Sequence, residues 1–393
     1  MPISKKVNEF MEKSSWIRKM FEEGIRLKQE YGEENVFDLS LGNPVIEPPE
    51  IVQHALVEAA KDTSPGLHRY MPNAGLQDVR AAIAEALSGE CKMEITANHL
   101  VMVCGAAGGL NITLKTLLDN GDEVIIFAPY FVEYLFYIDN HGGKAVPIKT
   151  NKDFSLDFDI LKNALNEKTK AVIINSPNNP TGVVYSCEEL KKLAEILKKH
   201  SKEAGRSVYL ISDDPYKKIT FDGVETANIL EFYENSVYIT SHSKDIALPG
   251  ERIGFVAVHP QCDDADSLIV GLIFSNRVLG FVNAPALIQR VIKNVQGVTV
   301  DVGQYQKKRD FLYGELTRIG YEVVKPKGAF YFFPKAPIFD EVEFAKKLAE
   351  EKVLVVPGRG FGCPGYFRIS YCLTDSVLEG SIVGFESAFR ACH

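Results

Sequence analysis

The middle of the chain alternates short apolar, β-branched runs with longer segments in which apolar residues recur at helical spacing. Several of the short runs are continuously apolar, which is typical of strands buried on both faces of a largely parallel sheet. This pattern predicts strands over Val124–Phe127, Lys144–Lys149, Ala171–Ile174, Val208–Ile211, Val237–Thr240 and Ile253–Val258.

Helical segments separate these strands. The clearest is Ser186–Ala204, where Ser186 and Glu189 form a capping box and Gly205 provides a helix stop. Similar patterns predict helices over Leu76–Leu87 and Leu110–Leu118. Because strands and helices alternate, the sequence predicts an α/β fold with a mostly parallel central sheet flanked by helices.

The pattern changes from about Asp264 onward. Longer helical segments alternate there with only a few short strands, which predicts a smaller α+β unit. The expected helices cover residues 264–278, 286–299, 303–318 and 340–351, the expected strands cover Leu354–Val356 and Phe367–Ser370, and a last helix ends near Arg390.

Composition excludes several classes of function. The 393 residues carry a net charge of -8, which argues against nucleic acid as the main partner. No run of about 18 apolar residues and no apolar leader is present, so we expect a cytoplasmic protein without a membrane partner. The seven cysteines include no CxxC and the chain has no HExxH, so we expect neither a disulfide framework nor a metal site.

One lysine is a candidate for covalent chemistry. Lys244 follows a predicted strand in the segment Ser241-His-Ser-Lys244, and Arg252 comes eight residues later. A lysine amine that can lose its proton forms Schiff bases with carbonyl compounds. Ser241, Ser243 and Arg252 together could hold a phosphate. Taken alone, the same segment is equally consistent with an exposed lysine on a turn.

Polar residues also follow two other predicted strands. Asp213 and Tyr216 come after the strand at 208–211, and Asn179 lies in a proline-rich loop after the strand at 171–174. Ligands of open α/β sheets bind outside the carboxyl ends of the strands, and an acid there can hold a protonated pyridine nitrogen. Considered alone, the Asp-Pro sequence at Asp213 is better explained as an ordinary turn.

A glycine-rich segment and a late arginine complete the candidates. The segment Cys104–Gly109 precedes a predicted helix, where small residues let an anion approach the backbone. Its glycines do not have GxGxxG spacing and no P-loop lysine follows, which argues against a nucleotide-binding dehydrogenase. Arg368 lies within the predicted strand at 367–370 and could bind a carboxylate in a bidentate manner, although an edge-strand arginine is the simpler interpretation.

The ordered set of these residues resembles the class I/II aminotransferase family of fold-type I pyridoxal-phosphate enzymes. The set consists of Gly105, Asn179, Asp213, Lys244, Arg252 and Arg368. The resemblance extends over nearly the whole chain, from Asp38-Leu-Ser-Leu-Gly42 to the last helix. It implies a large cofactor-binding domain at residues 46–284 and a small domain formed by residues 1–45 and 285–393.

The resemblance also implies roles for individual residues. Lys244 would form a Schiff base with pyridoxal 5'-phosphate and then move the proton of the substrate. Asp213 would keep the pyridine nitrogen protonated, and Tyr216 and Asn179 would bind the phenolic oxygen of the ring. The residues implied to hold the phosphate are Gly105, Ala106, Ala107, Ser241, Ser243 and Arg252.

Four further positions follow from the resemblance. Phe131 would stack on the cofactor ring, and Tyr70 would reach the phosphate of a partner subunit across a homodimer interface. Arg368 would bind the substrate α-carboxylate, assisted by Gly42 and Asn179. When each residue is considered by itself, Phe131 could equally be a core aromatic and Tyr70 a turn residue.

The expected activity is transfer of an amino group from an L-amino acid to a 2-oxo acid such as 2-oxoglutarate. Arg277 lies near the position where some aspartate-specific relatives have an arginine, so an aspartate-like donor is a further hypothesis. Two alternatives remain open. The first is a pyridoxal-phosphate-dependent C–S β-lyase, which would release pyruvate and ammonia without an acceptor. The second is a non-catalytic regulator that has kept the fold.

Overall fold

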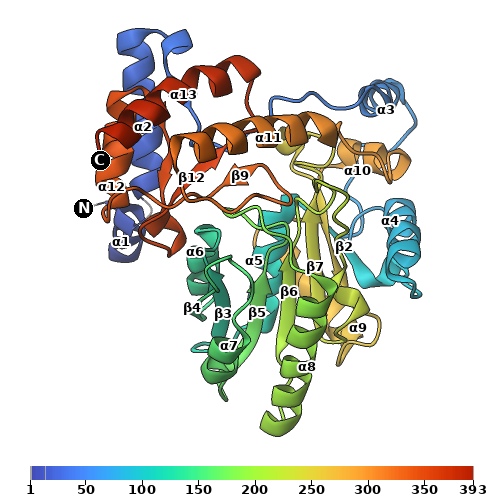
Figure 1. The fold of residues 1–393 in the computed structure, drawn as a ribbon. Helices are drawn as coiled ribbons and strands as arrows, with labels where there is room; N and C mark the ends of the chain where they lie inside the picture. Colours follow the sequence, from blue (N-terminus) through green and yellow to red (C-terminus); the bar gives the residue numbers. More distant parts are fainter. Residues whose placement is uncertain (1, 14, 393) are drawn as a thin grey trace.

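The computed structural model describes residues 2–13 and 15–392, and its centre is a seven-stranded sheet with the order β2-β8-β7-β6-β5-β3-β4 (Figure 1). Strand β8 is antiparallel to both of its neighbours, and the other neighbours pair in parallel. The strands are β2 (Leu100–Val103), β3 (Glu123–Ala128), β4 (Lys144–Lys149), β5 (Thr169–Ile174), β6 (Tyr209–Asp213), β7 (Ser236–Ser241) and β8 (Gly254–Val258). The six predicted strands are all present, whereas β2 was not predicted.

Helices cover both faces of this sheet (Figure 1). One face packs against α5 (Gly105–Leu117), α6 (Glu133–Asn140) and α9 (Ala265–Val278). The other face packs against two groups of helices. These are α7 (Phe158–Ala164) and α8 (Cys187–Ala204) under β3, β5 and β6, and α3 (Glu50–Lys61), α4 (Gln77–Cys91) and α10 (Ala286–Asn294) under β2, β7 and β8.

Local sequence explains two of these helices. The capping box of α8 is present, because Ser186 Oγ accepts from the Glu189 amide at 3.2 Å and the Glu189 carboxylate accepts from the Ser186 amide. Helix α5 lies close against the sheet at Gly109, where an added Cβ would come within 2.7 Å of the Ile239 side chain. A larger residue at this position would therefore push the helix away from the strands.

A second layer of small sheets and helices lies beyond the carboxyl ends of the parallel strands (Figure 1). In it, β12 pairs antiparallel with both β9 and β11, while β1 pairs in parallel with β10. The elements are β1 (Phe37–Asp38), β9 (Tyr331–Phe332), β10 (Val353–Leu354), β11 (Val356–Pro357), β12 (Phe367–Ser370), α11 (Val302–Ile319), α12 (Glu341–Glu350) and α13 (Asp375–Arg390). The predicted division into domains at residues 45/46 and 284/285 stays a prediction.

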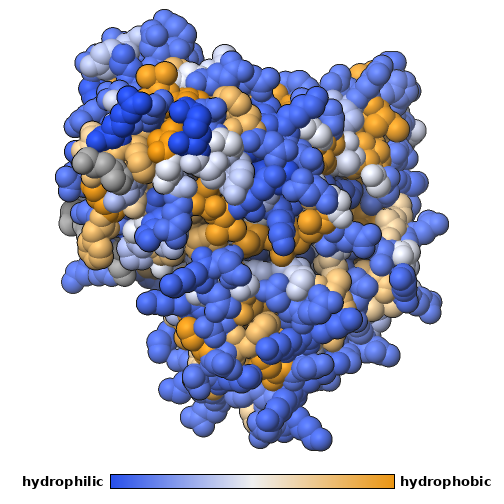
Figure 2. All heavy atoms as spheres, in the orientation of Figure 1, coloured by the Kyte–Doolittle hydropathy of each residue, from blue (hydrophilic) through white to orange (hydrophobic). Residues whose placement is uncertain are grey.

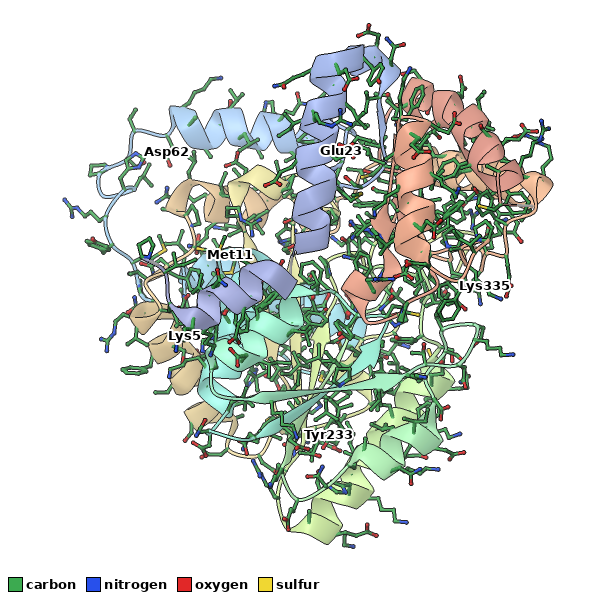
Figure 3. All side chains as sticks on the ribbon, turned by 90° about the vertical axis from the view of Figure 1, so that its left-hand side faces the viewer. Lys5, Met11, Glu23, Asp62, Tyr233 and Lys335 are labelled. Atoms are coloured by element: carbon green, nitrogen blue, oxygen red, sulfur yellow. The ribbon has the colours of Figure 1, made fainter. Side chains whose placement is uncertain are left out.

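The amino-terminal helices lie along the side of the molecule (Figure 3). Helix α1 (Lys5–Lys13) rests on α6, where the ring centroids of Phe10 and Phe136 are 4.9 Å apart. Helix α2 (Ser15–Tyr31) leads to β1 and lies near α12 and α13 in the view of Figure 1. In the described part of the chain, no helix is long and apolar enough to cross a membrane. The face in Figure 2 is mostly hydrophilic, with apolar residues in separate patches.

Three predicted boundaries were wrong, each for a physical reason. Helix α5 begins at Gly105 rather than Leu110, because its glycines are placed by packing against the sheet and not by helix propensity. The helix predicted over 286–299 ends at Asn294, and Gly297 then adopts a φ of +81°. The strand predicted over 354–356 is divided between β10 and β11, which belong to different sheets.

Candidate active site

A cavity of about 390 Å³ lies between the carboxyl ends of β5, β6 and β7 and the small sheet that contains β9 and β12. We call it the front cavity. Twelve of the predicted site residues line it: Gly42, Ala106, Ala107, Phe131, Asn179, Asp213, Tyr216, Ser241, Ser243, Lys244, Arg252 and Arg368. The structure therefore brings together residues that are separated by more than three hundred positions in the sequence.

Lys244 lies just after β7, and its Nζ donates a hydrogen bond to the carbonyl oxygen of Gly42 at 2.9 Å. Burial lowers the pKa of this amine to about 8, and the positive charges of Arg252 and Arg368 act in the same direction. A lysine with this pKa is neutral as often as it is charged near pH 8. Its lone pair is thus available as a nucleophile or a base at ordinary pH.

Asp213 is the last residue of β6 and is buried. Its Oδ2 accepts a hydrogen bond from the Tyr134 hydroxyl at 2.7 Å. Its Oδ1 is also buried and has no hydrogen-bond partner among the described residues. Burial raises the pKa of Asp213 to about 6, against the opposing effect of the Tyr134 hydrogen bond. A charged N–H group from a ligand would satisfy Oδ1 and keep the carboxylate ionised.

One end of the front cavity is suited to an anion. Helix α5 starts there with Gly105, whose φ is +72°, and a Cβ at this position would lie 2.5 Å from Arg252 Nη2. Glycine is therefore required for Arg252 to approach the helix start. Ser241 and Ser243 are buried beside this point, with their hydroxyl oxygens 3.2 Å apart. Free amides of a first helical turn, an arginine and two hydroxyls together form a phosphate-type site.

The opposite end holds a second arginine, which is buried on β12. Arg368 Nη2 donates to the Ser40 carbonyl oxygen at 2.6 Å, and Nη1 donates to Asn179 Oδ1 at 3.1 Å. Its Nε has no partner, and within the described residues no carboxylate forms an ion pair with it. A buried guanidinium without a counterion costs free energy. A ligand carboxylate would supply that missing charge.

Two tyrosines connect the ends of the front cavity. The hydroxyl oxygens of Tyr216 and Tyr331 are 2.9 Å apart, and the Tyr331 ring lies under the Arg368 guanidinium at 4.7 Å. Burial raises the pKa of Tyr331 to about 12 and the pKa of Tyr216 well above its usual value. Both phenols are therefore neutral hydrogen-bond donors. Gly42 leaves room for this pair, since a Cβ there would meet the Tyr331 hydroxyl.

Two candidates lie outside the front cavity of this chain. Tyr70 is 94% exposed, in a loop close to Phe281 and Asn283. Arg277 is exposed on α9, with its guanidinium carbon 5.3 Å from the centroid of the Phe274 ring. The roles assigned to these two residues stay predictions.

Several residues that line or support the front cavity were not predicted from the sequence, and three of them bear on the site most directly. Tyr134 orients Asp213, Tyr331 contacts both Tyr216 and Arg368, and Glu133 lines the cavity at the start of α6. Tyr134 lies one helical turn after Phe131, so the predicted role of Phe131 could have drawn attention to it. No signal marks Tyr331, which lies in a continuous run of aromatic residues.

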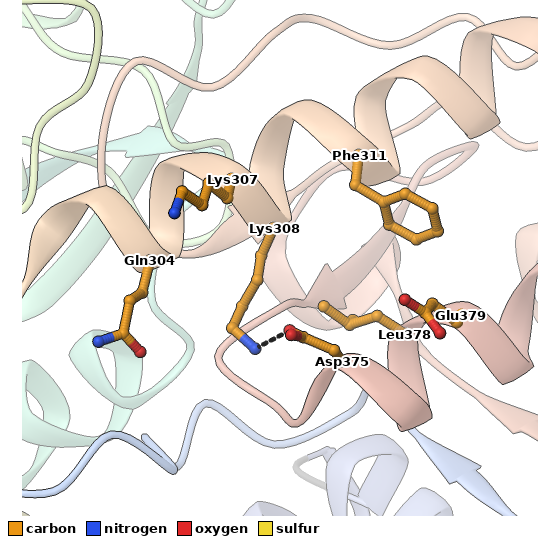
Figure 4. Close-up of a pocket in the computed structure, with 7 residues that line it drawn as sticks. All are labelled: Gln304, Lys307, Lys308, Phe311, Asp375, Leu378 and Glu379. Atoms are coloured by element: carbon orange, nitrogen blue, oxygen red, sulfur yellow. Dashed lines mark hydrogen bonds and ion pairs between the residues drawn. The ribbon is translucent and has the colours of Figure 1, made fainter.

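A hollow of about 340 Å³ between α11 and α13 has a different character (Figure 4). Its walls include Lys308, which is already bound to the Leu373 carbonyl oxygen and to the Asp375 carboxylate. The remaining lining residues are Gln304, Lys307, Phe311, Leu378 and Glu379, and none of them was a predicted site residue. This hollow offers no arrangement of reactive groups comparable to that of the front cavity.

Comparison with known proteins identifies the family. The family model described as "Aminotransferase class I and II" matches residues 34–382. The chain belongs to the class I and II aminotransferases. This membership confirms the fold-type I α/β architecture and the predicted activity class, a pyridoxal-phosphate-dependent transferase that acts on amino acids.

Named relatives agree with this assignment. A probable aspartate/prephenate aminotransferase of Aquifex aeolicus is 35% identical, over 91% of this chain and 91% of that protein. An aspartate aminotransferase of Bacillus subtilis is 32% identical, over 88% of this chain and 90% of that protein. An amino transferase structure from Eubacterium rectale is 41% identical, with a TM-score of 0.96, and covers 100% of this chain and 99% of its own.

Proposed function

We propose that this aminotransferase binds pyridoxal 5'-phosphate in the front cavity and moves an amino group from an L-amino acid to a 2-oxo acid. The observation that carries the proposal is the unsatisfied Oδ1 of buried Asp213, with an anion site at one side and an unpaired arginine at the other. A protonated pyridine nitrogen, a phosphate and a substrate carboxylate match these three places. The chemistry that the bound cofactor supplies is withdrawal of electrons from the substrate Cα.

The residues around Asp213 hold and orient the cofactor in this proposal. Asp213 accepts a hydrogen bond from the pyridine nitrogen and keeps it protonated, while Tyr134 fixes the carboxylate from behind. The phenolic oxygen of the cofactor is bound by Tyr216 and Asn179, and Phe131 covers the ring. The phosphate is held by Arg252, Ser241 and Ser243, together with the amides of Ala106 and Ala107 and the backbone at Gly105.

Lys244 moves the proton in this proposal. Its neutral amine accepts a proton from the substrate Cα and then donates a proton to the cofactor side of the bound substrate. The lowered pKa of about 8 favours this role, because a large fraction of the amine is neutral near pH 8. The Gly42 carbonyl, which accepts from Nζ at 2.9 Å, fixes the direction of the amine.

Arg368 binds the α-carboxylate of both substrates. Its guanidinium is held by the Ser40 carbonyl and by Asn179, so the fork is in place before the ligand arrives. Preorganisation of this kind reduces the conformational entropy that is lost on binding. Burial beneath the small sheet also limits the access of water, which strengthens the charge–charge interaction.

The proposal extends to a homodimer and to an acidic donor. Tyr70 is almost fully exposed, which supports a role at the phosphate of a partner subunit. Relatives named as aspartate aminotransferases support an aspartate-like donor. Equilibrium sedimentation tests the dimer. The activity of Arg277→Ala on aspartate tests whether Arg277 binds the side-chain carboxylate of the donor. Retained activity would exclude that role.

The first experiment is an absorption spectrum of the purified protein loaded with pyridoxal phosphate. Single amino acids are added without a 2-oxo acid. A yellow band that is bleached by particular amino acids, and restored by 2-oxoglutarate, is the expected result and ranks the donors. The Lys244→Ala variant is the control and should not show this bleaching by donor amino acids. Absence of a band from the wild-type protein would reject the proposal, and release of pyruvate and ammonia without an acceptor would favour the lyase.

A further inference from the structure

A second cavity, of about 620 Å³, lies behind the end of β6. We call it the rear cavity. Pro215 lines both the front and the rear cavity, so the two are separated by the segment that follows Asp213. The apolar part of its wall comes from α4, β7 and β8. The principal apolar residues are Ile83, Leu87, Tyr238 and Phe255.

His242 lines the rear cavity and carries an unused hydrogen-bonding atom. The side chain is 8% exposed, and its Nδ1 lies 3.1 Å from Asp245 Oδ2. Because a carboxylate only accepts, Nδ1 carries a proton, and in the tautomer whose single ring proton is on Nδ1 the other nitrogen, Nε2, is an acceptor. Nε2 is buried and has no partner among the described residues. A buried acceptor without a donor lowers the stability of the folded protein.

Asp214 provides a second acceptor in the same wall. It is 3% exposed, and its Oδ1 accepts from the Ser212 hydroxyl at 2.8 Å and from the Ser176 amide at 3.3 Å. Its Oδ2 receives no hydrogen bond from the described residues. Burial raises the pKa of this carboxyl to about 7. A cationic donor beside it would favour the ionised form.

The cations of the rear cavity are already paired. Lys217 forms an ion pair with Glu90, and Lys218 Nζ lies 3.3 Å from Asp245 Oδ2. Neither ammonium is therefore free to attract an anion. Two acceptors of the wall, His242 Nε2 and Asp214 Oδ2, receive no hydrogen bond from the described residues. The apolar residues share the wall with threonines, Gln296 and Glu225. The volume falls within the range of pockets that hold small organic molecules.

We propose that the rear cavity is a binding site for an organic ammonium ion that carries an apolar group. The N–H donors of the ligand bind His242 Nε2 and Asp214 Oδ2, and its apolar group packs against Leu87 and Phe255. This site is distinct from the front cavity and does not depend on the function proposed above. The ligand needs both groups, because the two acceptors bind its ammonium group and the apolar residues of the wall bind its apolar group.

Calorimetric titration of the cofactor-loaded enzyme with N-methyl-2-phenylethylamine tests the proposal. This probe is a secondary amine, so it does not condense with a carbonyl to give a neutral imine and does not replace Lys244. We expect saturable binding to the wild-type protein. The uncharged ether of the same shape should bind at least about tenfold more weakly, because it lacks charged hydrogen bonds. Failure of the amine to bind, or equal binding of the ether, would overturn the proposal.

Matched variants locate the binding. Ala86 is exposed on α4 and lines the rear cavity, so Ala86→Trp fills the space without removing a polar group. Ala81 is exposed on the same helix outside the cavity, and Ala81→Trp serves as the control. We expect Ala86→Trp to weaken binding at least about tenfold and Ala81→Trp to leave it unchanged. Unaltered binding to Ala86→Trp would place the amine elsewhere and overturn the proposal.

Polar variants test the acceptors. Asp214→Asn keeps an oxygen for Ser212 and Ser176 but removes the charge, and we expect about a tenfold loss of affinity for the amine. His242→Phe should have a similar effect through loss of Nε2. Both variants retain the front-cavity groups, so the donor-dependent bleaching of the cofactor band checks that they are folded. Full affinity in both variants would overturn the assignment of these acceptors.

Discussion

Asp213 and Asp214 are consecutive residues, yet they line different cavities on the two sides of the end of β6. Both are buried, and burial raises the pKa of the first to about 6 and of the second to about 7. The cations around them differ. In the front cavity, Arg368 has no carboxylate partner among the described residues. In the rear cavity, Lys217 and Lys218 each form an ion pair with a carboxylate of the protein.

This difference shows that residue types alone do not define a site. Both cavities contain a buried aspartate, basic residues and aromatic rings. The two cavities differ in which buried donors and acceptors have no hydrogen-bond partner within the protein. Among the described residues, the front cavity leaves the donor Arg368 Nε and the acceptor Asp213 Oδ1 buried without a partner, while the rear cavity leaves His242 Nε2. The variants below test whether this distinction governs function.

Lys244→Ala should have the largest effect. Loss of proton transfer alone lowers turnover by about 10²–10⁴-fold, and loss of the covalent link adds to it. The measurement is the rate of a single half-reaction with a donor amino acid. Lys218→Ala is the matched control in the rear cavity and should stay within about threefold of wild type. Near-normal turnover of Lys244→Ala would remove this residue from catalysis.

Asp213→Asn should lower kcat/KM by roughly 10- to 100-fold, because a hydrogen bond to a charged partner contributes about 1.5–3 kcal/mol. Asp214→Asn changes the neighbouring residue in the same way and should remain within about threefold. Steady-state kinetics on both variants gives the comparison directly. Equal losses in the two variants would show that the front and rear carboxyls do not have separate roles.

Arg368→Lys should lower kcat/KM by about tenfold, since lysine keeps the charge but not the bidentate fork. The loss should be expressed mainly in KM. An amine donor without an α-carboxylate provides the control, because the wild type and the variant should use it equally poorly. If the substitution lowered kcat/KM for that amine as much as it lowered kcat/KM for amino acids, Arg368 would not be the carboxylate ligand.

Tyr331→Phe should have a smaller effect, a roughly two- to tenfold loss in kcat/KM. It removes one neutral hydrogen bond, that to Tyr216, and leaves the ring under Arg368. Tyr371→Phe is the matched control, because that buried hydroxyl donates only to the Ala329 carbonyl. An equal loss in both variants would indicate a general packing effect rather than a role in the site.

The smallest effect concerns stability. The folded pKa of Asp214, about 7, lies above its value in an unfolded chain, so its contribution is fully present at low pH and is lost as pH rises through 7. Asparagine does not titrate. The unfolding free energy of Asp214→Asn, relative to wild type, should therefore increase by about 1 kcal/mol between pH 6 and pH 7. A constant difference in urea unfolding would contradict a raised pKa.

The sequence predicted the central sheet well because buried parallel strands are continuous apolar runs. Strand β2 was not predicted because it is followed directly by a glycine-rich segment that resembles a loop. Its position is determined by pairing with β8, some 150 residues away, and not by local pattern.

The site was predictable to the extent that its residues follow strands or carry a recognisable motif. Lys244, Asp213 and Asn179 all come at the carboxyl ends of parallel strands, which necessarily meet at one edge. Tyr134 and Tyr331 were not predicted, because their roles depend on partners 79 and 115 residues away. The rear cavity was not predicted either, since it exists only where α4 packs beside the sheet.

The pairing of β1 with β10 joins the beginning of the chain to its last fifth. Residues that follow β1 supply the Gly42 carbonyl for Lys244 and the Ser40 carbonyl for Arg368, while Arg368 itself lies 328 positions after Ser40. During synthesis, the central sheet can thus form while the substrate clamp is still incomplete. The proposed α-carboxylate clamp of Arg368 and Ser40 is therefore completed only by residues that follow the whole central sheet in the chain.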